Sequence, residues 1–182
     1  MTISRDLFLS ILTLDSYNRG YNAGINTLEE QPNTQIGAAT LTRASGESGK
    51  DIGFYATAYD WNGETIISYR GTDNFGPFES TTAGASDIWT GWSLASGFLA
   101  GTQAASAIAF YNDVVGQSVY DRAPASITTT GHSLGGALAG FTASLSGAKA
   151  VLFDHEPTPV DTTFLLLNGA AAYTAWPCRP SS

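Results

Sequence analysis

The sequence predicts an α/β domain with a mostly parallel sheet, flanking helices and an antiparallel hairpin toward the N-terminus. Three observations favour this class. β-Branched residues at 127–130 lead through a tight turn into an Ala- and Leu-rich segment at 134–146, the order strand, turn, helix. An apolar segment at 148–153 provides the next strand, and Asn62-Gly63 joins two extended segments upstream. Residues 1–182 suffice for a single domain with a full core.

The N-terminal segment is expected to begin with a helix. Residues 3–17 fit a short amphipathic helix, and Gly20 lies where such a helix ends. A short edge strand is expected at 36–41, and 44–50 has the composition of a loop. The apolar residues that recur on the helix face are Ile3, Leu7, Ile11 and Leu14, with Phe8 widening it.

The hairpin is the clearest local signal before the turn at 131–135. Apolar residues alternate through 52–59, Asn62-Gly63 is typical of a two-residue turn, and 65–69 returns as the partner strand. This strand places Arg70-Gly71-Thr72 at its carboxyl end. Functional groups of open α/β sheets gather at that edge.

A long segment separates the hairpin from the next strand. Residues 73–91 are rich in Gly, Ser and Thr yet carry large apolar side chains, which indicates a long loop folded onto the core. A helix is expected at about 102–119. The residues expected to face the sheet are Ala105, Ile108, Ala109, Val115 and Val119.

The C-terminal part of the chain has weaker signals. Pro157 and Pro159 end the strand at 148–153, and the apolar run at 162–167 is too short to assign by periodicity. From about residue 168 the composition does not indicate a native end of such a domain, so this tail is interpreted as disordered or non-native.

Composition excludes several partners and leaves the compartment open. Sixteen acidic and eight basic residues give a net charge of −8, which argues against nucleic acid or an anionic membrane surface as the main partner. No run is long enough to cross a bilayer, and no signal peptide is visible. Cys178 is the single cysteine, so no internal disulfide can form. Because no His, Cys and carboxylate set has ligand spacing, neither a metal nor a cofactor is expected.

The turn Gly131-His132-Ser133-Leu134-Gly135 is a G-x-S-x-G motif between a strand and a helix. A serine at the tip of such a turn adopts a strained backbone and needs small neighbours two residues away on either side. The hydroxyl is then exposed, and the N–H groups at the helix start can hold an oxyanion. The alternative is a Gly-rich turn whose serine caps the helix. Ser133 is therefore the candidate nucleophile.

Two segments resemble the class 3 lipase family, the fungal triacylglycerol lipase group of α/β-hydrolases. Gly-His-Ser-Leu-Gly-Gly-Ala-Leu-Ala from Gly131 is similar to its nucleophile segment, and Ser68-Tyr69-Arg70-Gly71-Thr72 to its oxyanion block. The resemblance covers roughly residues 52–155. It implies an α/β-hydrolase-like fold and a serine esterase or lipase that acts on ester or acylglycerol substrates through an acyl-enzyme. It also implies that 73–91 forms a lid.

The resemblance supplies two oxyanion donors. Thr72 matches the family's Ser/Thr position and would give both a backbone N–H and a hydroxyl. Leu134 follows the nucleophile, so its N–H is the other donor. The alternative for Thr72 is an ordinary turn residue after Arg70-Gly71. Asp73 is a candidate for an ion pair with Arg70.

A serine needs a base, and the chain has two histidines. His132 adjoins the nucleophile and is expected to pack beside the turn at 131–135, called the elbow below. His155 lies 22 residues after Ser133 at the carboxyl end of the next strand. Asp154 resembles a triad acid by position, but neighbouring strand residues point oppositely, so Asp154 and His155 act together only if the strand has ended. Glu156 and Asp161 are substitutes for the acid.

The C-terminal third departs from the family pattern, which places the histidine late in the chain. Only 49 residues follow Ser133, too few for the usual further strand–helix units, so the sheet is expected to be truncated on that side. Three arrangements remain open. His155 is the base of a shortened enzyme, or another molecule donates the base through a homodimer at an exposed sheet edge. In the third, the chain is a truncated or impaired relative that binds acyl ligands or a partner without efficient turnover.

Overall fold

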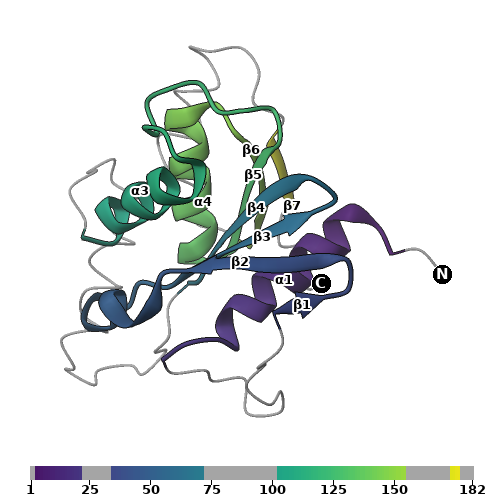
Figure 1. The fold of residues 1–182 in the computed structure, drawn as a ribbon, viewed down its shortest axis with the longest axis horizontal. Coiled ribbons are helices and arrows are strands. Elements are labelled where there is room, and N and C mark those ends of the chain that lie inside the picture. Colours follow the sequence, from purple (N-terminus) through teal and green to yellow (C-terminus); the bar gives the residue numbers. More distant parts are fainter. Residues whose placement is uncertain (1–2, 22–33, 72–101, 155–172, 177–182) are drawn as a thin grey trace, which may run out of the picture.

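The computed structural model describes residues 3–21, 34–71, 102–154 and 173–176 (Figure 1). The described strands form one seven-stranded sheet in the order β1-β2-β3-β4-β5-β6-β7, antiparallel from β1 to β4 and parallel from β4 to β7. The strands are β1 Gln35–Ile36, β2 Ala39–Ala44, β3 Ala56–Trp61, β4 Glu64–Tyr69, β5 Ile127–His132, β6 Lys149–Phe153 and β7 Tyr173–Trp176. The helices are α1 Arg5–Tyr17, the 3₁₀ helix η1 Gly46–Ile52, α3 Thr102–Val115 and α4 Leu134–Ser146. The predicted α/β-hydrolase-like class is confirmed.

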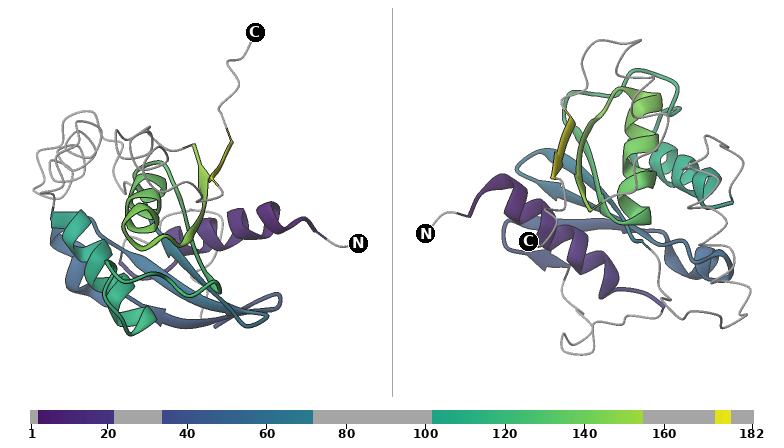
Figure 2. Two further views of the ribbon diagram at one scale, coloured as in Figure 1. Left: turned by 90° about the horizontal axis from the view of Figure 1, so that it is seen from above. Right: turned by 180° about the vertical axis from the view of Figure 1, so that it is seen from behind.

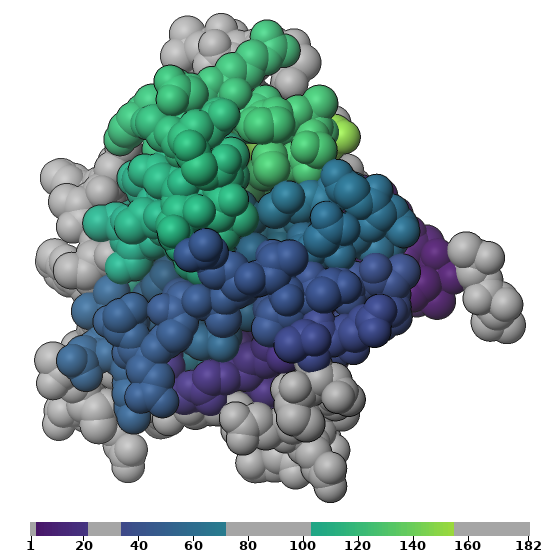
Figure 3. Space-filling model, in the orientation of Figure 1, coloured from purple at the N-terminus to yellow at the C-terminus, as the bar shows by residue number. Residues whose placement is uncertain are grey.

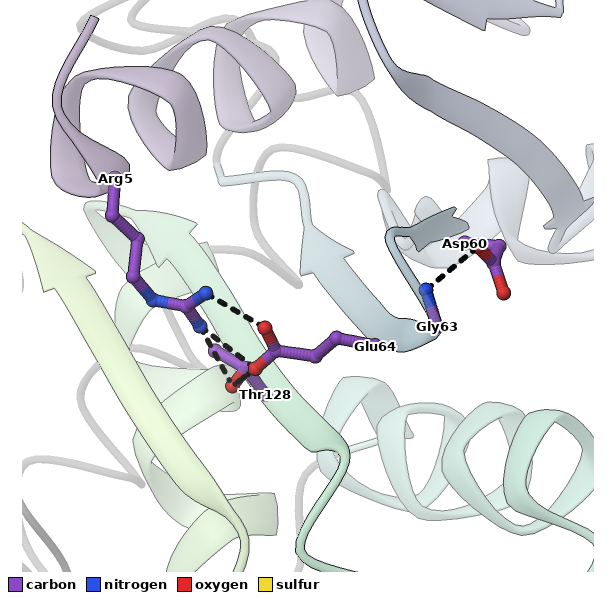
Figure 4. Close-up of polar contacts among 5 residues, drawn as sticks. All are labelled: Arg5, Asp60, Gly63, Glu64 and Thr128. Carbon is purple, nitrogen blue, oxygen red and sulfur yellow. Dashed lines mark hydrogen bonds and ion pairs between the residues drawn. The ribbon is translucent and has the colours of Figure 1, made fainter.

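The hairpin between β3 and β4 has the predicted turn. Asn62 and Gly63 both have positive φ, 54° and 79°, as a type I′ turn requires. The Gly63 N–H donates to the Asp60 carboxylate at 3.3 Å (Figure 4). Three boundaries differ from the prediction. η1 occupies most of the expected loop at 44–50, and strand β3 begins only at Ala56. The expected edge strand at 36–41 is divided between β1 and β2.

Alternation along the strands divides the core into two layers. Ile67 and Leu152 pack with α3 and α4 on one face, whereas their neighbours Ile66 and Val151 pack with α1 on the other. The ribbon views show the same arrangement, with α3 and α4 on the side of the sheet opposite α1 (Figures 1 and 2). In the space-filling view, β2 crosses the front between α3 and α1 (Figure 3). The sheet therefore separates two helical layers, as the class predicts.

Helix α1 forms as predicted, but its apolar face does not pack on the sheet. Ser4 caps the helix by accepting a hydrogen bond from the Leu7 N–H. The buried side chains include Leu9 and Leu12. By contrast, the side chains that define the apolar face are exposed, at 45% for Ile3, 51% for Leu7, 37% for Ile11 and 46% for Leu14.

Polar contacts explain this orientation, because they align α1 with β5 from one end to the other. At the amino end, the Arg5 guanidinium forms a bidentate pair with the Glu64 carboxylate at 2.7 Å and reaches Thr128 at 3.3 Å (Figure 4). Midway, the hydroxyls of Thr13 and Thr130 lie 3.1 Å apart. The C-terminal end of α1 consequently lies at the carboxyl edge of the parallel strands.

The predicted sheet-facing side of the helix at 102–119 is confirmed only in part, because Val119 is buried in the core and Ile108 and Val115 pack against it. The helix ends at Val115, where Gly116 takes a φ of 75°. Ala105 and Ala109 are exposed, since the helix is rotated so that aromatic side chains reach the core. The buried residues that α3 contributes to the core are Ala104, Ala107, Phe110 and Tyr111.

The sheet continues beyond β6 into the C-terminal tail. Residues 173–176, within the tail that the composition interprets as disordered or non-native, form β7 and pair in parallel with β6. The apolar run at 162–167 and the predicted lid at 73–91 lie outside the described residues.

Candidate active site

Ser133 lies between β5 and α4 in a strained conformation. Its φ of 55° and ψ of −129° are rare for a residue with a side chain. The Ser133 N–H donates to the Phe153 carbonyl at 3.1 Å, which ties the turn to the end of β6. The serine side chain makes no capping hydrogen bond to α4. The helix-capping alternative therefore lacks the contact that would define it.

The glycines of the motif are required by close backbone approaches, as predicted. A Cβ at Gly131 would collide with the Gly135 carbonyl, within the turn itself. A Cβ at Gly135 would collide with the Tyr69 carbonyl and lie 2.8 Å from the Arg70 carbonyl carbon, at the end of β4. The elbow is consequently packed, backbone against backbone, on the strand that precedes Gly71 and Thr72.

Helix α4 supplies the positive end of a helix dipole at this point. Leu134 is its first residue, so the Leu134 N–H is among the four that have no acceptor within the helix. The Leu134 side chain is buried in the core, which fixes the start of the helix relative to the sheet. An N–H group is thus available beside Ser133.

The end of β4 is held by a buried cation. The Arg70 guanidinium lies 4.5 Å from the ring centre of Tyr21 and 4.6 Å from that of Tyr55. It also donates to the carbonyls of Arg19 and Tyr21, at 3.1 and 3.0 Å. Arg70 therefore joins β4 to the segment that follows α1. Thr72 and Asp73, the predicted oxyanion donor and the candidate ion-pair partner, lie outside the described residues.

Gly71 brings the end of β4 into contact with the elbow. Its N–H donates to the Tyr17 hydroxyl at 2.9 Å. A Cβ on Gly71 would collide with that hydroxyl and lie 2.7 Å from the His132 carbonyl oxygen. The same hydroxyl donates to the His132 carbonyl at 3.3 Å. Three segments meet here: the last residue of α1, the residue after β4 and the elbow.

Asp154 follows the end of β6, as its pairing with a neighbouring histidine requires. Its φ is 45°, so the chain has left the extended conformation. A carboxylate oxygen of Asp154 lies 3.8 Å from Nε2 of His132, and both side chains are largely exposed. His155, Glu156 and Asp161 lie outside the described residues. The structure thus places Asp154 at the sheet edge of Ser133 and beside His132.

His132 packs beside the elbow, as expected. Its Nδ1 lies 3.4 Å from the Tyr17 hydroxyl, and the two rings meet edge to face with centroids 6.3 Å apart. Tyr17 is the residue that sequence reasoning missed. No local pattern marks it, because its partners are 54 and 115 residues away in the chain.

A largely apolar hollow adjoins the elbow on the α1 side of the sheet. Its volume is about 320 Å³. Its lining residues are Ser10, Thr13, Leu14, Tyr17, His132 and Phe153. The hollow therefore reaches from the exposed face of α1 to the residue that precedes Ser133.

The described residues show neither a metal site nor a membrane-spanning helix. Over 3–21, 34–71, 102–154 and 173–176, no group of three or more His, Cys, Asp or Glu side chains could hold a metal ion. Within the same part of the chain, no helix has the length and apolar character needed to cross a membrane.

Comparison with known proteins gives a family match. The model of the family described as Lipase (class 3) matches residues 66–157, which is 92 of the 182 residues and so just over half of the chain. The matched region runs from β4 through the elbow and α4 to the segment after β6. No curated protein matches the chain significantly.

Proposed function

The chain belongs to the class 3 lipase family, and we propose that it is a serine carboxylic ester hydrolase that acts through an acyl-enzyme on Ser133. Family membership implies a lipase or esterase. The observation that carries the finer proposal is the backbone of Ser133, which is strained at the carboxyl edge of the sheet while the side chain makes no capping bond. Strain of this kind is retained at a site where the side chain must be presented outward.

The proposed chemistry is acyl transfer in two steps. The Ser133 hydroxyl oxygen attacks the ester carbonyl carbon as its proton passes to a base, and the carbonyl oxygen becomes an oxyanion. The Leu134 N–H, together with the N–H and hydroxyl of Thr72, stabilises that charge. Collapse breaks the bond to the alcohol, which leaves with the proton, and forms the acyl-enzyme. Water then repeats the sequence and releases the acid.

For the base we propose His155, with Asp154 as the acid that orients it. The support is positional, because Asp154 lies directly after β6, at the same sheet edge as Ser133. The proximity of Asp154 to His132 favours a competing function. If that contact occupies the carboxylate, the chain is an acyl-ligand- or partner-binding relative with little turnover.

The proposed substrate is a neutral ester or acylglycerol. A protein with a net charge of −8 disfavours anionic substrates, and the hollow beside His132 is largely apolar. We expect short or medium acyl chains to be preferred over long ones if the loop at 73–91 is the only lid.

A p-nitrophenyl ester assay on the full chain tests the function. Ser133→Ala and His155→Ala should both abolish turnover, whereas Ser48→Ala, an exposed serine on η1, should leave it unchanged. Activity that survives Ser133→Ala would refute the enzyme. Loss in Ser133→Ala with full activity in His155→Ala would retain the nucleophile and reject this base.

A further inference from the structure

We propose that Tyr17 is a positioning residue whose hydroxyl holds the oxyanion-hole segment at Gly71 against the nucleophile elbow at His132. The proposal rests on the proposed function, because it concerns the geometry of that same site. Among the described residues, the structure shows no contact between Tyr17 and the reacting atoms. Its role is to fix the separation of two backbone segments that each carry one oxyanion donor.

The hydroxyl hydrogen-bonds to both segments, and it also lies 3.4 Å from Nδ1 of His132. It accepts from the Gly71 N–H at 2.9 Å and donates to the His132 carbonyl at 3.3 Å. These two partners immediately precede a proposed oxyanion donor and the proposed nucleophile. Gly71 precedes Thr72 in the chain, and His132 precedes Ser133. One atom therefore bridges Gly71 and His132, the residues next to Thr72 and Ser133 in the chain.

The two segments also approach each other closely. The Gly71 Cα lies so close to the elbow that a Cβ would sit 2.7 Å from the His132 carbonyl oxygen and 3.4 Å from the Gly135 nitrogen. Gly135 in turn lies against the Tyr69 carbonyl. With glycine on both sides, the spacing is set by backbone contact and by the Tyr17 bridge.

The position of Tyr17 is itself fixed by the rest of α1. The Arg5 pair with Glu64 and the Thr13–Thr130 contact hold the helix along β5, so its last residue arrives at the carboxyl edge. After the helix ends, Arg70 binds the carbonyls of Arg19 and Tyr21 and secures the following segment to β4. The Tyr17 hydroxyl is thus held in place by contacts of the residues before it and after it in the chain.

The test is Tyr17→Phe in the full chain, with Tyr59→Phe as the matched control. Phe keeps the ring beside His132 and removes the hydroxyl, and with it both the bridge and the contact to His132 Nδ1. Tyr59→Phe likewise removes one buried hydroxyl that binds α1, through Asp15 at 2.6 Å, but it lies away from the elbow. Both variants should lose stability, and only Tyr17→Phe should lose catalysis.

We expect Tyr17→Phe to lower kcat for a p-nitrophenyl ester about tenfold, because small displacements of oxyanion donors are costly. KM should stay within about twofold of the wild type, since ground-state binding is not affected. The Ki of phenylboronic acid, which forms a tetrahedral adduct with serine, should rise by the same factor as kcat falls. Wild-type kcat and Ki in Tyr17→Phe, or an equal loss in Tyr59→Phe, would overturn the proposal.

Amide hydrogen exchange at Gly71 separates failure of this inference from failure of the proposed function. Without its acceptor, the Gly71 N–H should exchange about tenfold faster or more in Tyr17→Phe and at the wild-type rate in Tyr59→Phe. This readout needs no turnover. If Ser133→Ala shows that the chain is not an esterase, unchanged exchange at Gly71 still rejects the bridge, and accelerated exchange still supports it.

Discussion

Glycine and serine have different structural roles in the elbow. Ser133 has the positive φ. Gly131 and Gly135 lack a Cβ, which allows the backbones of strand, turn and helix to be in contact. These roles follow from a five-residue pattern, so sequence alone predicts the proposed nucleophile. The Tyr17 bridge joins residues 54 and 115 positions away, so no local pattern reveals it. Motif reasoning finds the proposed nucleophile and misses Tyr17.

Gly135→Ala and Gly147→Ala test the steric claim as a pair. At Gly135 the added methyl meets the Tyr69 carbonyl, so the backbone must shift, and we expect a loss of about 3 kcal/mol or more. At Gly147 nothing lies within 4 Å, and only the φ of 73° opposes alanine, at about 1 kcal/mol. Urea denaturation measures both. Similar losses in the two variants would contradict the close-packed elbow.

Thr72→Val and Thr72→Ser test the proposed oxyanion donor. Valine removes the hydroxyl while keeping the shape, and kcat should fall about 100-fold, the usual cost of one such donor. Serine restores the hydroxyl, so its kcat should stay within about tenfold of the wild type. Steady-state kinetics on a p-nitrophenyl ester distinguish them. An active valine variant would exclude the Thr72 hydroxyl as an oxyanion donor.

Among the elements, the hairpin, the elbow helix and the strands beside it are predicted well, because turn residues and β-branched runs are local signals. The faces of α1 and α3 are predicted only in part, because Phe8 and Ile108 pack inward as expected whereas Leu7 and Ala105 are exposed. Hydrophobic periodicity selects the outer stripe of α1, whereas the structure turns Thr13 and Asp15 inward to bind Thr130, Arg19 and Tyr59. Satisfied polar groups can occupy an inner face as well as apolar ones do.

Leu9→Ala and Leu7→Ala test the orientation of α1. Leu9 is fully buried against the sheet, so its truncation should cost about 2–5 kcal/mol. Leu7 is 51% exposed and should cost less than about 1 kcal/mol. The two substitutions have the same effect on helix propensity, which leaves burial as the difference. A larger loss at Leu7 would mean that the apolar face packs inward after all.

The Arg5–Glu64 pair makes the anchoring of α1 depend on pH. Burial raises the pKa of Glu64, but hydrogen bonds from Arg5 and Thr128 outweigh it, so the pKa lies below its ordinary value of 4.5. Because the unfolded chain takes up the proton first, this contribution is full above about pH 4.5 and disappears as pH falls through the lowered pKa.

Glu64→Gln should therefore destabilise the protein by about 1 kcal/mol or less near neutral pH, the usual range for such pairs. The difference from the wild type should shrink as pH falls below 4.5. Denaturation across this pH range is the measurement. A stability difference between Glu64→Gln and the wild type that grows as pH falls would contradict the lowered pKa of Glu64.

For the molecule as a whole, the open sheet ends at β1 and β7 within the described residues. Sheet edges invite pairing with another strand, and one arrangement for the base requires a second copy of the chain. Size-exclusion chromatography at two concentrations decides this. A donated base predicts a dimer that forms as concentration rises, with activity following it. A monomer at both concentrations would reject the donated base and leave two arrangements, His155 as the base or an impaired relative with little turnover.

The central claim is that Ser133 is held out of a strained turn where an electrophile can reach it. Fluorophosphonate labelling of the folded chain, read by peptide mass spectrometry, tests this most directly. We expect one modified residue, Ser133, with labelling lost in Ser133→Ala and retained in Ser48→Ala. A folded chain that is not labelled, or is labelled at another serine, would contradict it.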